Sequence, residues 1–321
     1  MTKDSEFRAQ ASACANFGIV KYWGKRDDAL NLPCADSLGV GIEALRSHCE
    51  LEWGNWQADE LLVDGVPVGA TGAQRAKRIF DAVRKRAGFS LSARARAYNE
   101  FPASAGLASS SSGMAALAVA AAQAARLQLK ESELSCLARL GSGSAARAIV
   151  RGWTHWRRGE LEDGSDSFAQ TLFFAEHWPL KVFIVLLSKA PKTKSSAEGM
   201  RICRETSVFW EAFQDSCAAD IERCKRAIEE RNIGALSRCA NANSMRLHAL
   251  CISALPAIWY LQPESIAIYN DVCALAEENI HCVCSFDAGP NPVVLCEAAD
   301  AERVKRKLLG YGYELIESRV A

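Results

Sequence analysis

The spacing of apolar and polar residues predicts a mixture of strands and helices along the whole chain. Residues 11–23 are small, apolar and in part β-branched, which predicts a strand that ends in a cationic, aromatic segment. Residues 91–98 alternate between alanines and arginines, as expected for a half-buried strand. Residues 37–66 contain short apolar runs separated by glycine and asparagine, so we expect several short strands there.

Apolar residues at helical spacing predict helices between these strands. In residues 73–87 the apolar positions are spaced by four and the opposite face is strongly basic. An alanine-rich helix is expected from residue 113 to 126, another over 131–140, and one long helix over 197–231. From residue 280 onwards the pattern predicts strand, turn, strand, helix and strand.

Strands and helices occur in mixed order in both halves, which favours an α+β fold over a regular parallel sheet. A boundary is expected where His177-Trp178-Pro179 precedes a new strand over 182–187. We therefore expect two domains, residues 1–178 and 179–321. The length of 321 residues agrees with this division, since one domain typically takes ~150 residues.

Composition excludes several classes of protein. The 38 basic and 38 acidic residues balance to a net charge of zero, which argues against non-specific nucleic-acid binding. Because no run of about 18 uncharged apolar residues exists and residues 1–10 lack an apolar core, we expect neither a membrane span nor a secretion signal. The 13 cysteines show no CxxC spacing, which disfavours a metal site and favours reduced thiols in the cytoplasm.

A small-residue loop over 102–113 is the first segment suited to chemistry. It reads PASAGLASSSSG and joins a predicted strand to an alanine-rich helix. Free N–H groups at a helix N-terminus can hold phosphate, so the loop is a candidate anion site. The sequence fits neither the Walker A pattern nor GxGxxG. A flexible capped turn is the alternative interpretation.

A second glycine- and serine-rich turn begins at Gly141 and leads into a helix that contains Arg147. Ser142 and Ser144 can cap this helix or donate to an anion. Arg147 can bind a carboxylate or phosphate through two parallel hydrogen bonds. The alternative is an ordinary surface arginine.

Two further segments carry charge at the ends of apolar strands. Asp287 follows such a strand, where it can cap the Gly-Pro turn or accept a proton from a substrate hydroxyl. Lys21 and Lys25 flank Tyr22 and Trp23, which suggests either snorkelling side chains at a strand end or a cationic pocket with aromatic walls.

Together these segments resemble the mevalonate diphosphate decarboxylases of the GHMP kinase superfamily. The glycine-rich loop alone indicates only the superfamily, whereas KYWGK and DAGPN indicate the decarboxylase branch. The resemblance rests on four motifs, which run from the N-terminus to residue 291: Ala15-Asn16…Lys21-Tyr22-Trp23-Gly24-Lys25-Arg26, Pro102…Gly106-Leu107-Ala108-Ser109-Ser110, Gly141-Ser142-Gly143-Ser144-Ala145…Arg147, and Phe286-Asp287-Ala288-Gly289-Pro290-Asn291.

The resemblance implies a two-domain GHMP-kinase-like fold in a homodimer. The N-terminal domain would contain a βαβ unit and the C-terminal domain would be a ferredoxin-like α/β sandwich. The implied reaction is the ATP- and Mg²⁺-dependent decarboxylation of mevalonate 5-diphosphate to isopentenyl diphosphate, with release of ADP, phosphate and CO₂, in isoprenoid biosynthesis. No nucleic-acid or membrane partner is implied.

The resemblance also assigns roles to residues that match the family motifs. Asp287 would orient and deprotonate the C3 hydroxyl, and Lys21 would position either Asp287 or the transferring phosphoryl group. Arg147 with Asn16 would hold the carboxylate. The residues expected to bind the substrate are Tyr22, Trp23, Gly24, Lys25, Arg75, Ser142, Gly143, Ser144 and Ser196. Those expected to hold the ATP phosphates are Ala105, Gly106, Leu107, Ala108, Ser109 and Ser110.

One position departs from the family pattern. Ala197 stands where the family often has Arg or Thr, whose side chain is expected to contact the substrate's diphosphate. Either Lys192 or Lys194 compensates, or the substrate carries one phosphate or none. A phosphomevalonate decarboxylase, a mevalonate 3-kinase and a non-catalytic ATP-binding homologue therefore remain alternatives.

Overall fold

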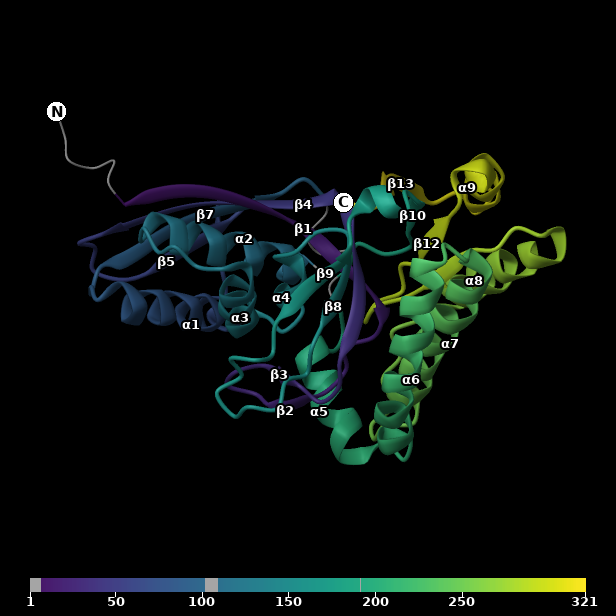
Figure 1. Ribbon diagram of the computed structural model, residues 1–321, viewed down its shortest axis with the longest axis horizontal. Coiled ribbons are helices and arrows are strands. Elements are labelled where there is room, and N and C mark those ends of the chain that lie inside the picture. The colour runs from purple at the N-terminus through teal and green to yellow at the C-terminus, as the bar shows by residue number, and fades with distance from the viewer. Residues whose placement is uncertain (1–6, 102–108, 191) are drawn as a thin grey trace.

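The computed structural model describes residues 7–101, 109–190 and 192–321. Within these ranges, two β-sheets with packed helices form the expected α+β fold (Figure 1). The strands of the larger sheet are β1 (Arg8–Val20), β4 (Ser37–Gly54), β5 (Glu60–Val63), β6 (Val66–Pro67), β7 (Ser92–Asn99), β8 (Trp153–Trp156) and β9 (Ala169–Phe173). They lie in the order β6-β5-β7-β4-β8-β9, and β1 pairs with β4. Strands β2 (Lys25–Asp27) and β3 (Leu32–Pro33) pair separately.

Residues 37–54 form one long strand, so the prediction of several short strands is wrong there. The first part of β4 pairs with β8 and the last part with β7. Gly39 and Gly41, which look like turn residues in the sequence, lie inside this strand. Each has another part of the chain pressed against it: Asn16 beside Gly39, and Ala321 beside Gly41. Here glycine provides close approach rather than a turn.

Helices cover one face of the larger sheet (Figure 1). They are α1 (Ala70–Ala87), α2 (Ser109–Ala124), α3 (Glu131–Gly141) and α4 (Ala145–Ala148). The helix predicted over 73–87 is confirmed as α1, which buries Ala76, Ile79, Phe80 and Val83. Because β5 and β7 pair in parallel on either side of α1 in the sequence, they form the expected βαβ unit.

The smaller sheet contains β10 (Lys181–Leu186), β11 (Val283–Ser285), β12 (Val293–Cys296) and β13 (Glu314–Arg319). Its order is β11-β12-β10-β13, and every pair is antiparallel. This is the ferredoxin-like order expected for the C-terminal part. Strand β10 is buried on both faces, since Val182 and Ile184 enter one core cluster whereas Phe183 and Val185 enter another.

The remaining helices are α5 (Ser196–Thr206), α6 (Trp210–Glu229), α7 (Ile233–Ile252), α8 (Pro263–Ala274) and α9 (Ala301–Leu309). The single helix predicted over 197–231 is therefore wrong. Ser207 interrupts it, because its hydroxyl bonds to Ser253 Oγ at 2.5 Å and accepts the N–H of Phe209 at 3.3 Å. Such local side-chain bonds compete with a continuing helix.

One apolar core joins the two sheets. It includes Ile19 of β1, Val182 of β10 and Leu247 of α7. The chain end contributes too, since Ala321 donates its N–H to Gly41 O at 3.0 Å and accepts the N–H of Gly152 at 2.8 Å. Among the described helices, none is long and apolar enough to cross a membrane. The shared core fixes the end of β1 against α7 and the turn after β11.

Candidate active site

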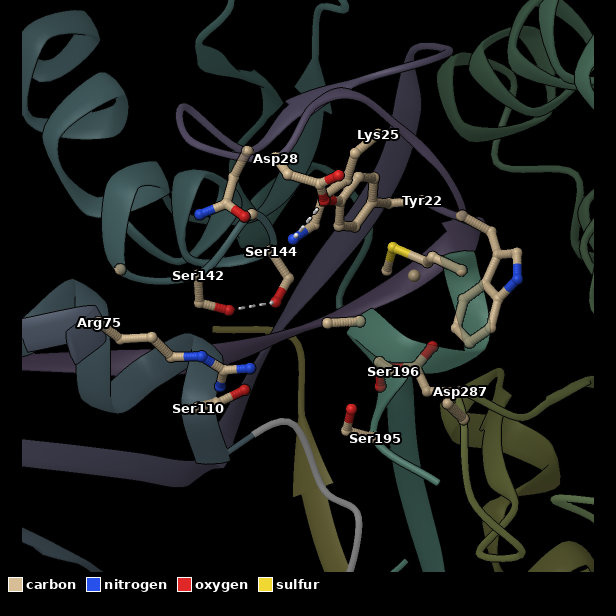
Figure 2. Close-up of a pocket in the computed structure, with 18 of the residues that line it drawn as sticks. Tyr22, Lys25, Asp28, Arg75, Ser110, Ser142, Ser144, Ser195, Ser196 and Asp287 are labelled. Carbon is tan, nitrogen blue, oxygen red and sulfur yellow. Dashed lines mark hydrogen bonds and ion pairs between the residues drawn. The ribbon is translucent and has the colours of Figure 1, made fainter. Parts of the chain in front are cut away.

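A cavity of about 460 Å³ opens where the two sheets meet. Figure 2 shows Arg75, Ser110 and Ser142 on one side of it and Asp287, Ser195 and Ser196 on the other. Most residues that the sequence indicated come together in its lining: Asn16, Lys21, Tyr22, Trp23, Lys25, Arg75, Ser110, Ser142, Gly143, Ser144, Arg147, Ser196 and Asp287.

Of the remaining expected residues, Gly24 is not among the described residues that line the cavity. Gly24 has a φ of +124° and packs against the ring of Trp210, which leaves no room for a side chain. Ser109 is the first residue of α2. The others lie outside the described residues, namely Ala105, Gly106, Leu107 and Ala108.

Lys21 and Asp287 form the central ion pair. Lys21 follows the last residue of β1, and its Nζ lies 2.9 Å from Asp287 Oδ1 and 2.7 Å from Gly18 O. Burial lowers the pKa of Lys21, whereas the neighbouring Asp287 raises it. Lys21 is 3% exposed, but Asp287 remains partly open to the cavity. The Asp287 carboxylate is therefore fixed by the buried Lys21 and remains accessible to a molecule in the cavity.

Three charged groups meet beside Gly18. A Cβ at this position would lie 3.3 Å from Lys21 Cδ, 3.4 Å from Asp287 Oδ1 and 3.7 Å from an Nη of Arg147. A Cβ there would press slightly on Lys21 Cδ and would be in ordinary contact with the other two groups. Lys21, Arg147 and Asp287 therefore all lie close to one point of β1.

Arg147 is buried with neutral partners. Its Nε donates to Asn16 Oδ1 at 2.9 Å, and an Nη donates to Ser37 Oγ at 2.6 Å. Asn16 is fixed in turn, because its Nδ2 donates to Thr154 Oγ1 at 3.0 Å. Burial lowers the pKa of Arg147 to about 10, although Asp287 opposes this shift. A buried cation with neutral hydrogen-bond partners is suited to a carboxylate ligand.

Several cations gather at the other end of the cavity. Lys25, Arg75 and Arg78 all line it, and Asp28 lies 3.6 Å from Lys25 Nζ. Burial lowers the pKa of Lys25 and of Arg75, and in each case a neighbouring arginine lowers it further. Three cations beside the single carboxylate of Asp28 leave an excess of positive charge here, which favours an anion with more than one negative charge. Arg78, which lies one helical turn after Arg75, was not among the residues expected at the site from the sequence.

The hydroxyls of Tyr22, Ser142 and Ser144 face the same region. Tyr22 OH has no hydrogen-bond partner among the described residues, although it is buried. A side chain at Gly143 would collide with it. Ser142 and Ser144 lie 3.4 Å apart, Oγ to Oγ. An unpaired buried hydroxyl indicates a place for a polar ligand atom.

The N-terminus of α2 meets the cavity through Ser110. Ser111 donates its hydroxyl to Ser144 O at 3.0 Å, which ties α2 to the turn before α4. A helix start of this kind fits a phosphate group. Among the described residues, no group of three or more His, Cys, Asp or Glu side chains is placed to hold a metal ion. A Mg²⁺ carried on nucleotide phosphates fits such a site, because Mg²⁺ needs few protein ligands.

Of the two lysines near Ala197, Lys192 lies at the cavity and Lys194 forms an ion pair away from it. Lys192 lines the cavity and lies 3.4 Å from Ser196 Oγ. Burial lowers its pKa, whereas Asp287 raises it. Lys194 pairs with Glu198 at 2.8 Å and does not line the cavity. Of the two lysines considered as replacements for a larger residue at 197, Lys192 is the one that reaches the site.

This fold and cavity define an α+β protein of the two-domain GHMP-kinase-like class. The diphosphomevalonate decarboxylase-like N-terminal domain model matches residues 13–169, and the mevalonate 5-diphosphate decarboxylase C-terminal domain model matches residues 182–314. The chain belongs to the diphosphomevalonate decarboxylase family.

Individual relatives are similar to this protein over most of its chain. Diphosphomevalonate decarboxylase mvd1 of Aspergillus fumigatus is 33% identical, over 93% of this chain and 79% of its own length. The crystal structure of mevalonate diphosphate decarboxylase from Staphylococcus aureus has a TM-score of 0.91 and 32% identity, covering 98% of this chain and 96% of the other. A structure of MDDEF in complex with MVAPP, AMPPCP and magnesium has a TM-score of 0.90 and 31% identity, covering 97% and 96%.

Proposed function

We propose that this protein catalyses the ATP-dependent decarboxylation of mevalonate 5-diphosphate to isopentenyl diphosphate, with release of ADP, phosphate and CO₂. The observation that carries the proposal is the Lys21–Asp287 pair beside Arg147, in a cavity whose other end gathers Lys25 and Arg75. The relative with MVAPP, AMPPCP and magnesium supports the substrate, ATP and Mg²⁺.

Asp287 starts the reaction. Its carboxylate accepts the proton of the C3 hydroxyl, and Lys21 holds the carboxylate in position. The hydroxyl oxygen then attacks the γ-phosphorus of ATP, and ADP leaves. A tertiary alcohol is a poor leaving group, but the phosphate formed from it is a good one. The phosphorylation therefore removes the obstacle to the second step.

Arg147 and Asn16 act in the second step by holding the C1 carboxylate. As the C3–O bond breaks and phosphate leaves, positive charge develops at C3, and the nearby Asp287 carboxylate stabilises it. The C1–C2 bond then breaks, its electron pair forms the C2–C3 double bond, and CO₂ leaves. Fixed orientation of the carboxylate aligns the breaking bond with the developing empty orbital.

The remaining residues bind the charged ends of both substrates. Lys25, Arg75 and Lys192 provide positive charge, and hydroxyl groups complete the binding of the 5-diphosphate. The hydroxyls in this role are those of Tyr22, Ser142, Ser144 and Ser196, with Trp23, Gly24 and Gly143 shaping the pocket. The N-terminus of α2, with Ser109 and Ser110 and the backbone of residues 105–108, holds the ATP phosphates. Bound Mg²⁺ neutralises part of their charge.

We also propose that the chain divides into domains 1–178 and 179–321, works as a homodimer and lies in the cytoplasm. The two family models, which match 13–169 and 182–314, support the division. The 13 cysteines are all free thiols, which supports a reducing compartment. The homodimer rests on the family resemblance.

A turnover assay tests the proposed reaction. The protein is supplied with ATP, Mg²⁺ and mevalonate 5-diphosphate, and ADP and CO₂ are followed together. Parallel assays use the 5-monophosphate and unphosphorylated mevalonate. We expect equal release of ADP and CO₂ from the diphosphate. ADP without CO₂ would identify a kinase, turnover with a less phosphorylated substrate alone a sibling decarboxylase, and no turnover a non-catalytic homologue.

The Asp287→Asn variant tests the mechanism. Without a carboxylate to accept the proton, we expect kcat to fall by about 100- to 10,000-fold. ATP still binds, because the nucleotide-holding groups are unchanged, and calorimetric titration measures this. Asp215→Asn, at an exposed position on α6, is the matched control and keeps wild-type turnover. Near-normal turnover in Asp287→Asn would remove this residue from the mechanism.

A further inference from the structure

Helix α7 carries buried polar side chains where it crosses the end of β1 and the strand β11. Asn241, Asn243 and Ser244 are all buried. Each bonds to the backbone of a segment that leads into the site. Burying a polar group costs free energy of folding unless the group forms hydrogen bonds. The hydrogen-bond partners of these three side chains therefore indicate what the side chains hold in place.

Asn243 contacts Lys21 directly. Its Oδ1 accepts the backbone N–H of Lys21 at 2.9 Å, and the residue is fully buried. Strand β1 ends at Val20, so this N–H lies just beyond the strand. A buried N–H requires an acceptor, and the Asn243 side chain supplies it. The main chain of Lys21 is thereby fixed at the point from which Nζ reaches Asp287.

Asp220 of α6 fixes Asn243. Its Oδ2 accepts from Asn243 Nδ2 at 2.8 Å, and its carboxylate also pairs with Arg223 at 2.6 Å and Arg246 at 2.5 Å. Burial alone would raise the pKa of Asp220, but bonds from Asn243 and the two arginines hold it below its usual value. The carboxylate therefore stays ionised, and it orients the amide of Asn243 with its oxygen towards Lys21.

The next residue of α7 holds the other partner of the ion pair. Ser244 Oγ accepts the N–H of Phe286 at 3.0 Å and lies 3.4 Å from Phe286 O. Phe286 immediately precedes Asp287. The neighbouring residues Asn243 and Ser244 therefore bond to the main chain at Lys21 and just before Asp287. Lys21 and Asp287 are 266 positions apart in the sequence.

We propose that Asn243, anchored by Asp220, is a positioning residue that sets Lys21 against Asp287. The catalytic part of this inference rests on the proposed function, whereas the positioning itself does not. Asn243 is not itself among the described residues that line the cavity, and its bond to that lining is to the backbone N–H of Lys21. Its loss should therefore change the rate of the chemical step and not the binding of substrate.

The test compares Asn243→Ala with Asn241→Ala. Asn241 is a matched control because it is the same residue, buried on the same helix, and binds Cys284 N at 2.8 Å and Cys282 O at 3.3 Å instead of Lys21. Backbone hydrogen exchange is measured by mass spectrometry, and kcat and KM are measured for mevalonate 5-diphosphate. Folding of each variant is checked by its unfolding midpoint.

In Asn243→Ala we expect faster exchange at the Lys21 amide and a kcat lower by about 10- to 100-fold. KM stays within about twofold, as expected when only the chemical step is affected. In Asn241→Ala we expect faster exchange at the Cys284 amide with the protection of Lys21 retained and a much smaller loss of kcat. Equal losses of kcat in the two variants would mean a general packing effect and would overturn the proposal.

A double variant keeps the test independent of misfolding. Combining Asn243→Asp with Asp220→Asn exchanges the two side chains, so that one amide still donates to one carboxylate and an oxygen still faces the Lys21 N–H. We expect Lys21 protection and most of the lost kcat to return relative to Asn243→Ala. An active wild type with unchanged Lys21 exchange in Asn243→Ala would overturn the inference. An inactive wild type would contradict the proposed function and leave the exchange result standing.

Discussion

Gly39 limits how Arg147 and Asn16 can lie. It lies near the start of β4, where a Cβ would overlap Asn16 Oδ1 and lie 2.8 Å from Arg147 Nε. Both neighbours are buried and hydrogen-bonded to each other, so neither has room to move. The geometry of the Arg147–Asn16 pair therefore depends on a residue that itself has no polar side chain.

Gly39→Ala should separate this pair. We expect a loss of about 1–3 kcal/mol in the free energy of unfolding, as for other overpacked interiors. The kcat should fall with it, because Arg147 no longer holds its orientation. Gly69→Ala is the control, since a Cβ there meets nothing within 4 Å. Urea unfolding and the turnover assay measure both effects; equal behaviour of the two variants would contradict this account of Gly39.

The charged residues of the cavity could be predicted from the sequence, whereas the residues that hold them in position could not. Lys21, Arg147 and Asp287 stand in recognisable motifs next to glycines and strand ends. Gly39 and Asn243 carry no such signal, because their importance comes from which strand or helix lies opposite them. That pairing depends on register and packing across the whole chain.

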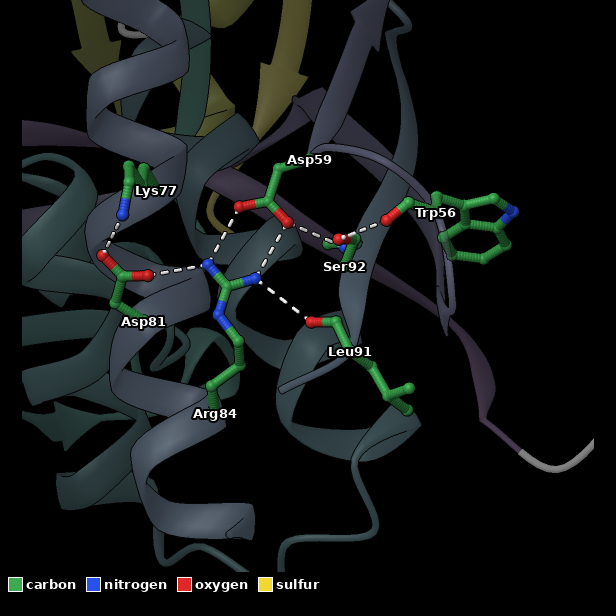
Figure 3. A network of polar contacts seen from close by, with 8 residues as sticks. Trp56, Asp59, Lys77, Asp81, Arg84, Leu91 and Ser92 are labelled. Atoms are coloured by element: carbon green, nitrogen blue, oxygen red, sulfur yellow. Dashed lines mark hydrogen bonds and ion pairs between the residues drawn. The ribbon is translucent and has the colours of Figure 1, made fainter. Parts of the chain in front are cut away.

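At the scale of elements, a polar network fastens α1 to the larger sheet (Figure 3). Arg84 donates to both oxygens of Asp59, at 2.8 and 2.9 Å, and also to Asp81 at 2.7 Å. Asp59 in turn accepts the N–H of Ala93 at 2.9 Å. The C-terminal turn of α1 is thus tied to the segment before β5 and to β7, which stabilises the βαβ unit.

Arg84→Lys should weaken this network, because an ammonium group cannot donate to both oxygens of Asp59 in the same planar arrangement. We expect the free energy of unfolding to fall by about 1–2 kcal/mol. The kcat of the folded protein should not change, since Arg84 is remote from the cavity lining. Arg86→Lys, at an exposed position of the same helix, is the control for urea unfolding. Equal midpoints for the two variants would count against the network.

Helices and strands with a regular spacing of apolar residues could be predicted from the sequence. Those whose bounds depend on contacts with distant parts of the chain could not. The residues of α1 show a clear apolar face, so the helix predicted from residue 73 is found three residues longer at its start. Strand β4 was missed because its glycines serve close packing. The break between α5 and α6 was missed because Ser207 depends on Ser253 of α7.

For the whole molecule, one buried imidazole links stability to pH. His248 of α7 lies in the interior between Tyr260 and Phe286, and its Nε2 has no hydrogen-bond partner among the described residues. Burial, together with the charge of Lys21, lowers the pKa of His248 to about 3, against the opposing effect of Asp287. The folded protein therefore keeps this ring neutral while the unfolded chain protonates it below about pH 6.5.

The sign of the effect follows from proton binding. Between pH 6.5 and 3 the unfolded chain binds one more proton at this site than the folded protein, so stability rises with pH. By pH 4.5 we expect His248 to cost the folded protein about 2–3 kcal/mol relative to pH 7. His248→Gln should reduce that pH dependence, as measured by urea unfolding at both pH values. Identical pH profiles would show that His248 does not titrate on unfolding.

The overall class could be predicted because both halves mix strands and helices, whereas the ferredoxin-like order of the C-terminal sheet was expected from the family resemblance. The sequence did not indicate that one core joins the two sheets. Val320, near the end of the chain, pairs with Ile42 of β4, and nothing local signals that return. Contacts between such distant positions depend on the folded chain as a whole.

The distance in sequence between Lys21 and Asp287 has a consequence for synthesis of the protein. A chain emerging from the ribosome displays Lys21, the serine-rich loop and Arg147 long before Asp287 has been added. The growing polypeptide can thus complete the larger sheet while it still lacks the carboxylate that we propose accepts the proton. A chain that has not yet reached residue 287 has Lys21 without its ion-pair partner, so we expect it to lack the proposed activity.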